Sequence, residues 1–351
     1  MKPTRVLHMH FGLDGGAERF FVNLAQALDQ AGVEQRFIIR PGRIWKAGIE
    51  SSGEIIENHF RRLSISGQLL PNRVRRLARQ WKPTAMMSWM PRASRLMPEY
   101  PDAIRLARLG DYPSHLRHFR HVDILVANAP GIAQHCRELG WTKPLIVISN
   151  FVRNVEVQPV PRATYDTPRD AFIVGASGRL VQRKGFDAIL RAVAAMPDAW
   201  IWIAGTGARE RDLRQLAENL GMTRRTKFLG WLNEPAHAMA STDVYLMASR
   251  NEPLGNVVLE AWHAGVPVIS SRSQGPLWFT TNGKDALLVD IDSVEQMTEA
   301  LLRLRSNPDL AARLINGGRK TLRTRFSRDS IVQQYLSVFR GNTEHHESLG
   351  S

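Results

Sequence analysis

Short apolar runs alternate with amphipathic helical patterns along the first part of the chain. RVLHMHF at 5–11 is followed by the helical pattern ERFFVNLAQALDQAG at 18–32 and then by QRFIIR at 35–40. Further strand candidates lie at 84–89, 121–128 and 144–150. Buried strands that alternate with helices are typical of a parallel sheet with helices on both faces, so we expect an α/β domain over residues 1–150.

The same alternation restarts after a segment without periodicity. Residues 151–170 contain three prolines and are predicted to be a linker. Six strand candidates with intervening helical patterns follow: AFIVGASGR, AWIWIAGTG, KFLGWL, DVYLMAS, PVISS and ALLVD. We expect a second doubly wound domain over 171–326, and a helix over 327–340 that starts at a Ser327 cap and crosses back to the first domain. Two such domains would face each other across a cleft at the carboxyl ends of their strands.

Composition indicates a folded protein without a membrane span. The 351 residues are 43% hydrophobic and 23% charged, as in ordinary globular proteins. No apolar run reaches the ~20 residues of a transmembrane helix, and the start MKPTRVLHMHFG lacks the apolar core of a signal peptide. The single cysteine, Cys136, cannot form an internal disulfide. We therefore expect a protein of the reducing cytoplasm.

Positive charge is concentrated in the first domain. The net charge is +14, and residues 1–150 hold 22 Lys and Arg against 12 Asp and Glu. No acid occurs between Asn58 and Pro98, a stretch with nine bases: Arg61, Arg62, Arg73, Arg75, Arg76, Arg79, Lys82, Arg92 and Arg95. Within it, NRVRRLARQWK has apolar residues at helical spacing. Such a helix is open to three interpretations: a core-packed helix with a solvated basic face, contact with an anionic membrane or phosphorylated substrate, or nucleic-acid binding.

Two glycine-containing turns join strands to helices at equivalent positions of the two halves. In FGLDGGAER, Gly15 and Gly16 permit close backbone approach, and the free N–H groups of a helix start favour an anion. The pattern is not GxGxxG, which disfavours a dinucleotide. In GASGRLVQRKG, Arg179 offers a planar fork and Lys184 a point charge, a pair suited to a diphosphate. The alternatives are a purely geometric turn and two exposed loop cations.

NEPLGNVVLE holds two glutamates separated by seven residues. Glu252 belongs to a loop, and Glu260 falls about one turn into the next predicted helix. Carboxylates accept hydrogen bonds from sugar hydroxyls, and the helix-start N–H groups of Leu254, Gly255 and Asn256 suit a diphosphate. One loop would thus hold a sugar, its phosphates and a ribose. The alternative is a capping acid and a solvated helix acid.

Together these segments resemble the retaining glycosyltransferases of GT-B family 4, the glycosyl transferases group 1, which include many bacterial lipopolysaccharide-core and capsule enzymes. The resemblance is carried by GGAERFFVNLAQAL, GRLVQRKGFDAIL, IAGTGARERDL, KFLGWL, DVYLMASRNEPLGNVVLEAWHAGVPVIS and SQGPLWFTTNGKDALLV. It covers residues 171–290 and also 1–35. It implies two Rossmann-like domains, the first for the acceptor and the second for a nucleotide-sugar donor.

The resemblance also implies roles for individual residues. Arg179 and Lys184 would neutralise the donor diphosphate, Glu252 would contact the donor sugar on its reacting face, and Glu260 would bind the ribose. The other donor-binding positions are Gly15, Gly16, Trp231, Leu232, Leu254, Gly255 and Asn256. Neither a metal nor a cofactor is expected, and a UDP-sugar is the first expectation for the donor, ahead of GDP-mannose.

The chain departs from the family in the middle of its first domain. Many relatives carry a histidine before a glycine there, whereas ARLGDYPSHLRHF has leucine in that place. Asp111 is the nearest polar candidate for the acceptor side. Trp89, in SWMPRAS, is a candidate for the acceptor pocket or for packing. His115 and His118 are predicted to be surface or core histidines without a catalytic role.

The leading hypothesis is a metal-independent retaining glycosyltransferase on the inner face of the cytoplasmic membrane. It would move a sugar from a nucleotide-sugar donor to a lipid-linked or lipopolysaccharide-core saccharide. Fixed cations and amides would stabilise the charge that grows on the departing diphosphate. The alternatives are a sugar-nucleotide epimerase or phosphorylase of the same fold, and a basic nucleic-acid-binding protein, although the chain has no aromatic-interleaved basic motif or zinc spacing.

Overall fold

The structure, a computed structural model, divides into two units. Unit 1 comprises Met1–Arg153 and Arg328–Ser351, and unit 2 comprises Asn154–Ser327. The residues that the structure describes are 3–13, 15–58, 65–153 and 155–342. Arg61 and Arg62, two bases of the acid-free stretch, lie outside these ranges.

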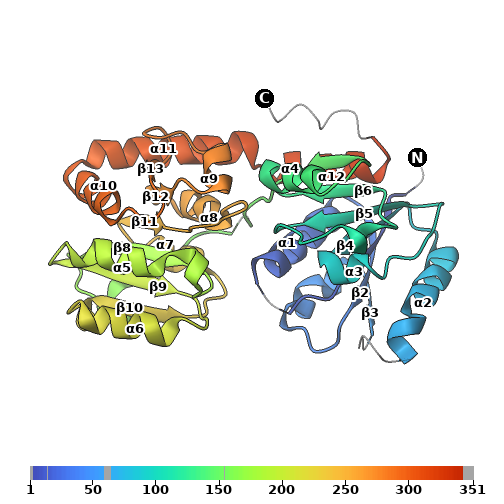
Figure 1. Cartoon of the computed structure of the whole chain (residues 1–351), viewed down its shortest axis with the longest axis horizontal. Coiled ribbons are helices and arrows are strands. Elements are labelled where there is room, and N and C mark those ends of the chain that lie inside the picture. Colours follow the sequence, from blue (N-terminus) through green and yellow to red (C-terminus); the bar gives the residue numbers. More distant parts are fainter. Residues whose placement is uncertain (1–2, 14, 59–64, 154, 343–351) are drawn as a thin grey trace. The chain divides into compact units, whose positions relative to one another are not determined.

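Unit 1 is built on a parallel sheet of seven strands in the order β3-β2-β1-β4-β5-β6-β7. The strands are β1 (Arg5–His10), β2 (Glu34–Ile39), β3 (Glu54–Glu57), β4 (Ala85–Trp89), β5 (Ile104–Leu109), β6 (Ile124–Ala127) and β7 (Leu145–Val147). The main helices are α1 (Gly16–Gln30), α2 (Ile65–Trp81), α3 (Met90–Ser94), α4 (Pro130–Glu138) and α12 (Arg328–Phe339). Figure 1 shows these helices on both faces of the sheet.

The two faces of the unit 1 sheet have separate cores. On one face, α1 and the C-terminal helix α12 pack together against the sheet, with Phe21 and Tyr335 fully buried between them and the strands. On the other face, α2 contributes Val74 and Ala78. The apolar face of α2 is therefore used in the core of unit 1, which is the first of the three interpretations of this helix, and its basic face lies outward.

Two strands of unit 1 are absent from the sequence prediction. β5, IRLARL, has two arginines that interrupt its apolar run: Arg105 pairs with Asp123 at 2.6 Å, and Arg108 is buried. β3, EIIE, is a short edge strand with a glutamate at each end. Edge strands and buried arginines both weaken the apolar signal on which strand prediction depends.

Unit 2 is built on a six-stranded parallel sheet in the order β10-β9-β8-β11-β12-β13. Its strands are β8 (Phe172–Ser177), β9 (Ala199–Ala204), β10 (Thr226–Gly230), β11 (Val244–Met247), β12 (Val268–Ser271) and β13 (Leu287–Val289). Its helices are α5 (Phe186–Ala194), α6 (Glu210–Asn219), α7 (Pro235–Met239), α8 (Asn256–Ala264), α9 (Gln274–Phe279), α10 (Val294–Ser306) and α11 (Pro308–Arg325). All six strands match the predicted candidates.

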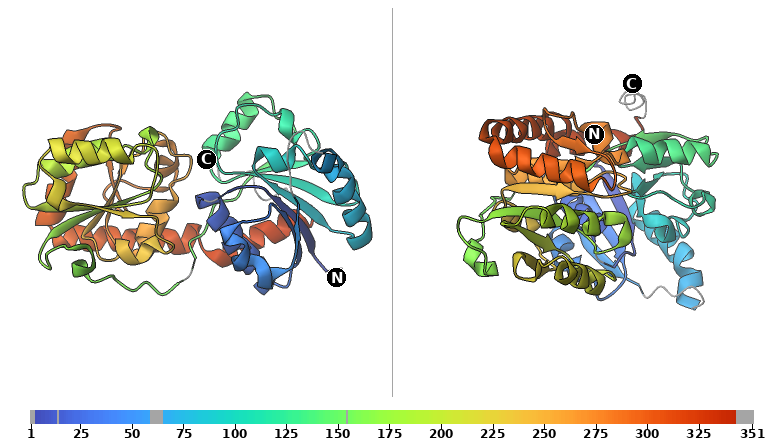
Figure 2. Two further views of the ribbon diagram at one scale, coloured as in Figure 1. Left: turned by 90° about the horizontal axis from the view of Figure 1, so that it is seen from below. Right: turned by 60° about the vertical axis from the view of Figure 1, so that its left-hand side comes forward.

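Helices cover both faces of the unit 2 sheet, as the two views in Figure 2 also show. The larger core contains side chains from β8, β9 and β11 and from α5, α6, α10 and α11. The predicted linker is packed against this unit: Arg162 binds Asp243 at 2.9 Å, and Ser241 Oγ donates to the carbonyl of Val160 at 2.7 Å. In the part of the chain that the structure describes, no helix combines the length and apolarity needed to cross a bilayer.

Candidate functional site

Three glycine-containing turns meet at the carboxyl edge of the unit 2 sheet. Gly178 follows β8, Gly205 and Gly207 follow β9, and Gly230 ends β10. A Cβ on Gly205 would lie 2.0 Å from the carbonyl oxygen of Gly178, and one on Gly207 would lie 2.4 Å from that of Leu180. The backbones are this close because they bond to one another, for example Gly178 N–H to the carbonyl of Ala204 at 2.9 Å. These glycines set the shape of the edge.

Lys184 and Glu252 form an ion pair at this edge. The lysine lies in a short 3-10 turn (Gln182–Lys184) before α5, and the Lys184 ammonium donates directly to Glu252 Oε2. The same oxygen accepts a hydrogen bond from Ser249 Oγ at 3.1 Å. The two side chains of the ion pair are only 16% and 12% exposed. Replacing only one residue of such a buried ion pair is costly, because the charge of the other residue is left unpaired.

Tyr245 is a buried residue of β11 on which the charges of both glutamates of the NEPLGNVVLE motif act. Its ring is buried on β11, and its hydroxyl accepts from Ser177 N–H at 3.0 Å and lies 2.9 Å from Ser177 Oγ. Burial raises the pKa of Tyr245, and the nearby charges of Glu260 and Glu252 raise it further. The charges of both sequence-predicted carboxylates therefore act on one neutral phenol. The sequence analysis did not single out this tyrosine, although it lies within the quoted strand DVYLMAS.

Arg250 ties together the segments that carry Lys184 and Glu252. Its guanidinium binds both carboxylate oxygens of Asp187 at 3.0 and 2.7 Å, and it binds Asp292 at 2.8–2.9 Å. It also donates to the carbonyl of Gln182 at 2.5 Å. The hydrogen bonds that Arg250 donates to Asp187 and Asp292 raise its pKa, so it is charged at all ordinary pH values. In the sequence, only its place directly before the motif signals this role.

The turn before α8 is formed around a glycine. Gly255 is the N-cap of α8 with φ 95°, a left-handed conformation that favours glycine. Leu254 is buried, and Asn256 begins the helix. Gly275 N–H donates to the carbonyl of Glu252 at 2.8 Å, and a Cβ there would lie 2.2 Å from the carbonyl oxygen of Leu254. Glycine in α9 thus lets a second backbone hold the Glu252 loop.

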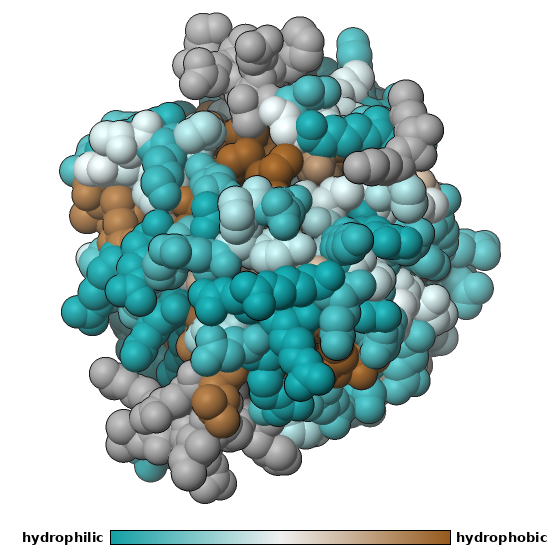
Figure 3. Space-filling model, turned by 90° about the vertical axis from the view of Figure 1, so that its right-hand side faces the viewer, coloured by the Kyte–Doolittle hydropathy of each residue, from teal (hydrophilic) through white to brown (hydrophobic). Residues whose placement is uncertain are grey.

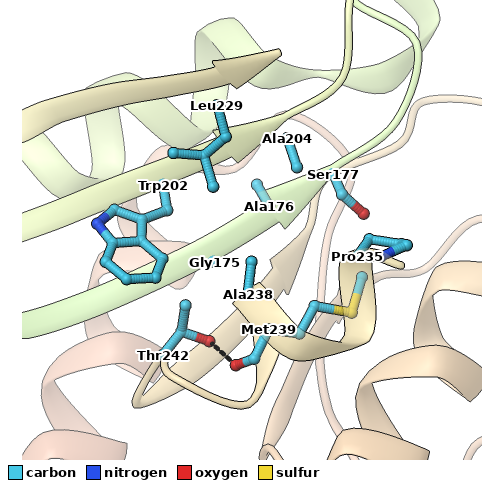
Figure 4. A pocket seen from close by; sticks show the side chains of 10 residues that line it. All are labelled: Gly175, Ala176, Ser177, Trp202, Ala204, Leu229, Pro235, Ala238, Met239 and Thr242. Carbon is cyan, nitrogen blue, oxygen red and sulfur yellow. Dashed lines mark hydrogen bonds between the residues drawn. The ribbon is translucent and has the colours of Figure 1, made fainter. Parts of the chain in front are cut away.

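The other donor-site candidates lie at the same edge, in the segments that follow β8 and β10. Arg179 is exposed two residues after β8. Trp231, 47% exposed, and the half-buried Leu232 follow the end of β10. Figure 4 shows a small hollow beneath this edge, lined by Ser177, Leu229 and side chains of α7. The edge of unit 2 thus combines an ion pair, a second carboxylate, exposed cationic and aromatic side chains and a helix start.

The unit 1 candidates lie on a different body of the molecule. Gly15 precedes α1, and Gly16 begins it. The carboxylate of Glu18 is buried against this turn, and its Oε1 lies 3.9 Å from His10 Nε2. Burial lowers the pKa of both His8 and His10 to about 3, and for His10 the charges of Arg108 and Arg43 add to the effect. Both imidazoles are therefore neutral at neutral pH.

The acceptor-side candidates differ in exposure. Trp89 is 2% exposed, its ring stacks on His10 with 5.6 Å between centroids, and its indole N–H donates to His8 Nδ1 at 3.3 Å. This burial corresponds to the packing alternative for Trp89. Asp111 is exposed after β5 and accepts from Tyr112 N–H at 3.0 Å. His115 and His118 lie edge to face in a surface segment, with 4.5 Å between their ring centroids.

Comparison with known proteins identifies the family. Residues 159–321 match the family model described as glycosyl transferases group 1. The lipopolysaccharide core biosynthesis glycosyltransferase LpsE of Rhizobium meliloti (strain 1021) is 47% identical over 334 residues, which are 95% of this chain and 98% of that protein. This chain belongs to the glycosyl transferases group 1 family. The resemblance stated from the sequence is therefore confirmed.

Solved structures confirm the GT-B fold class. A glycosyltransferase from Rickettsia africae ESF-5 has a TM-score of 0.85 at 17% identity and covers 98% of this chain and 100% of its own. Anabaena Alr3699/HepE, solved in complex with UDP and glucose, has a TM-score of 0.84 at 20% identity, and the match covers 95% of this chain and 99% of that protein's chain. At these identities the likeness concerns the fold.

Proposed function

We propose that this chain is a retaining glycosyltransferase that takes a sugar from a nucleotide-sugar donor and acts in lipopolysaccharide core biosynthesis. The observation that carries the proposal is the Lys184–Glu252 ion pair at the carboxyl edge of the unit 2 sheet. The charge of Glu260 acts, like that of Glu252, on Tyr245 of the same sheet. The name of the relative from Rhizobium meliloti supports the lipopolysaccharide core, and the complex of the Anabaena protein with UDP supports a UDP-sugar as the first donor to test.

Each residue of the site has a distinct role in the proposed reaction. Lys184 and Arg179 offset the charge that builds on the diphosphate as the bond to the sugar breaks, together with N–H groups at the start of α8. Glu252 accepts hydrogen bonds from donor-sugar hydroxyls and Glu260 from ribose hydroxyls. Because the diphosphate competes with Glu252 for the Lys184 ammonium, donor binding redistributes the ion pair. The acceptor hydroxyl attacks from the face that the phosphate leaves, and a phosphate oxygen takes its proton. Because the two cations and the helix-start amides supply the positive charge, the proposed reaction needs no metal.

A panel of sugar nucleotides tests the donor assignment. A ligand that binds only the folded protein at 100 times its Kd stabilises it by about 2.7 kcal/mol, so the matching donor should raise the melting temperature of the full chain. Lys184→Ala and Glu252→Ala should abolish that shift, while Glu295→Gln, a change at an exposed position of α10, should keep it. If no sugar nucleotide raises the melting temperature of the wild type, or if it raises that of all three variants equally, the proposed donor site is wrong.

Product analysis separates the reaction classes. With donor and a core oligosaccharide acceptor, a retaining transferase gives a glycoside with the anomeric configuration of the donor, which NMR reads directly. Conversion of the donor without an acceptor would instead identify an epimerase, and a sugar phosphate formed from inorganic phosphate would identify a phosphorylase. Either result would replace the proposed reaction while leaving the donor site in place.

We also propose that unit 1 contacts an anionic membrane surface through α2. Arg73, Arg76 and Arg79 are exposed on this helix, whereas Leu70, Val74 and Ala78 lie in the core and Leu69 is 49% exposed. Figure 3, which views the molecule from the side on which α2 lies in Figure 1, shows a mostly hydrophilic face with small separate hydrophobic areas. Attraction would therefore be electrostatic, at about 1 kcal/mol per base near the surface. Binding to phosphatidylglycerol vesicles that persists in 0.5 M NaCl would contradict it.

A further inference from the structure

Arg108 is a buried cation of unit 1 that is held by neutral partners. It lies on β5 and is 3% exposed. Its Nε donates to the hydroxyl of Tyr335 in α12 at 3.0 Å, and its Nη2 donates to the amide oxygen of Asn150. The rings of Phe20 and Trp89 lie against the guanidinium, with their centroids 4.4 and 5.3 Å from its Cζ. Within the described part of the chain, these hydrogen bonds use Nε and Nη2 and leave Nη1 for another acceptor.

Asn128, directly after the neighbouring strand β6, has a buried amide oxygen without a partner. β5 and β6 are parallel, with Leu109 opposite Ala127, and the backbone N–H of Asn128 donates to the carbonyl of Leu109 at 3.1 Å. The side chain of Asn128 is 4% exposed, and its Oδ1 has no hydrogen-bond partner among the described residues. Buried polar atoms are nearly always hydrogen-bonded, so this exception indicates a partner from outside the chain.

Gly110 leaves an open place between these two side chains. It directly follows β5 and is exposed. A Cβ on Gly110 would lie 3.5 Å from Arg108 Nη1 and 3.7 Å from Asn128 Nδ2, and in the described structure no other atom beyond its chain neighbours lies within 4 Å of that point. A ligand atom in the place of this Cβ would therefore face two N–H donors. Doubly wound sheets bind ligands at the carboxyl ends of their strands, and Gly110 lies at such an end.

The two side chains together match a sugar hydroxyl. A guanidinium only donates, whereas an amide both donates and accepts, and the terminal torsion of Asn128 allows the amide to turn and present its oxygen. A hydroxyl can accept from Arg108 and donate to Asn128, which an anionic oxygen cannot do. Asp111 directly follows Gly110, and a carboxylate beside the place disfavours an anion. An uncharged saccharide oxygen therefore fits here better than a phosphate.

We propose that Arg108 and Asn128 bind a hydroxyl group of an uncharged sugar of the saccharide acceptor, at the place that Gly110 leaves open. The proposal rests on the proposed function, because it takes unit 1 as the acceptor domain of a glycosyltransferase. It makes Arg108 and Asn128 specificity-determining residues of that domain. Tyr335 and the two aromatic rings hold the guanidinium before the sugar arrives, so little conformational freedom is lost on binding.

Gly110→Val fills the proposed place of the sugar without straining the fold. The two contacts of its Cβ are at ordinary distances, and the φ of Gly110 lies outside the left-handed range. In isothermal titration of the full chain with deacylated lipopolysaccharide-core oligosaccharide, without donor, the variant should have a Kd at least about 10-fold above that of the wild type. Ala312→Val, at an exposed position of α11, should leave the Kd within about twofold. Equal Kd values for Gly110→Val and the wild type, or no binding by the wild type, would overturn the proposal.

Asn128→Leu separates a binding role from a structural one. Leucine keeps the branched shape of the side chain, and because the amide oxygen has no partner among the described residues, the melting temperature should stay at the wild-type value or rise. The Kd for the oligosaccharide should rise about 3- to 10-fold, the effect of one hydrogen bond. Asn316→Leu, at an exposed position of α11, is the matched control and should leave the Kd unchanged. A lower melting temperature with an unchanged Kd in Asn128→Leu would show a structural role alone and overturn the proposal.

Two further comparisons keep other failures apart. Oligosaccharide dephosphorylated with hydrofluoric acid should show the same losses of affinity in Gly110→Val and Asn128→Leu; losses that vanish with this form would identify a phosphate as the bound group and overturn the proposal. The melting-temperature shift with sugar nucleotides should be the same in both variants and the wild type, and a shift lost only in the variants would assign the place to the donor and overturn the proposal. An absent shift in every protein, with the losses of oligosaccharide affinity intact, would reject the donor site alone.

Discussion

We expect Arg250 to hold the loops of the candidate site in unit 2 in position. It makes hydrogen bonds to Asp187, Asp292 and the carbonyl of Gln182, which is in the turn that carries Lys184. Its backbone N–H also donates to the carbonyl of Arg183 at 2.8 Å. Arg250→Lys keeps the charge but replaces a rigid fork with one ammonium, which cannot serve three partners at once.

The expected cost follows from these contacts. Buried hydrogen bonds to charged groups contribute about 1.5–3 kcal/mol to stability, and exposed ion pairs contribute about 0.2–1 kcal/mol. Because the Arg250 network is partly buried, its contribution should fall between these ranges, and Arg250→Lys should cost about 1–2 kcal/mol of stability. For a unit of this size, that corresponds to a fall of about 2–8 °C in melting temperature. Small displacements of Lys184 should lower kcat about 10-fold or more, because transfer depends on its position.

Arg305→Lys is the matched control for this prediction. Arg305, in α10, also forms a two-pronged pair, with Asp198 before β9, but the two side chains are 39% and 62% exposed. Because this pair is exposed to solvent, its loss should change the stability little and leave kcat unchanged. Calorimetry and steady-state transfer kinetics measure both variants. A wild-type kcat for Arg250→Lys, or an equal loss of stability in the control, would refute the reasoning.

Three further predictions follow from particular residues. Gly185→Ala and Gly221→Ala both place alanine at a left-handed φ, 68° and 67°, which should cost about 1–2 kcal/mol of stability in each case. Only Gly185→Ala also puts a Cβ 2.0 Å from the carbonyl oxygen of Ala248, so chemical denaturation should show a clearly larger loss of stability for this variant. Equal losses would show that this close approach does not matter for stability. His8 and His10 have pKa values of about 3 in the folded protein against 6.5 in the unfolded chain, so between these values they take up protons only on unfolding. The free energy of unfolding should therefore be about 2 kcal/mol lower per histidine at pH 5 than at pH 7. A urea midpoint that does not change over this pH range would contradict this prediction. Removal of divalent metals with EDTA should leave transfer within about twofold, since Lys184, Arg179 and helix-start amides supply the positive charge; a loss restored by Mg²⁺ or Mn²⁺ would show that a metal takes part.

The sequence predicted unit 2 more completely than unit 1. In unit 2, strands such as AWIWIA are continuous apolar runs. Glycine is required in the turns because the backbones at Gly205 and Gly178 lie too close together for a Cβ at Gly205. In unit 1, β5 escaped prediction because Arg108 is buried through hydrogen bonds with distant residues, including Tyr335 of α12. No local pattern reveals a partner more than two hundred positions away.

The candidate site shows the same division between local and distant information. Glu252, Glu260 and Lys184 stand in short recognisable motifs, and the structure brings Lys184 and Glu252 into contact although 68 positions separate them. The roles of Tyr245 and Arg250 became visible only with the fold, because they depend on Ser177, Asp187 and Asp292, which belong to other segments of unit 2.

Single-turnover transfer by Glu252→Gln tests the central claim most directly. The substitution keeps the shape of the side chain but removes the charge that binds Lys184 and that, in the proposed reaction, accepts hydrogen bonds from the donor sugar. With a matching sugar nucleotide and acceptor, the rate should fall about 10²–10³-fold, while Glu295→Gln, at an exposed position of α10, keeps the wild-type rate. A Glu252→Gln protein that folds and transfers within about threefold of the wild type would contradict the account.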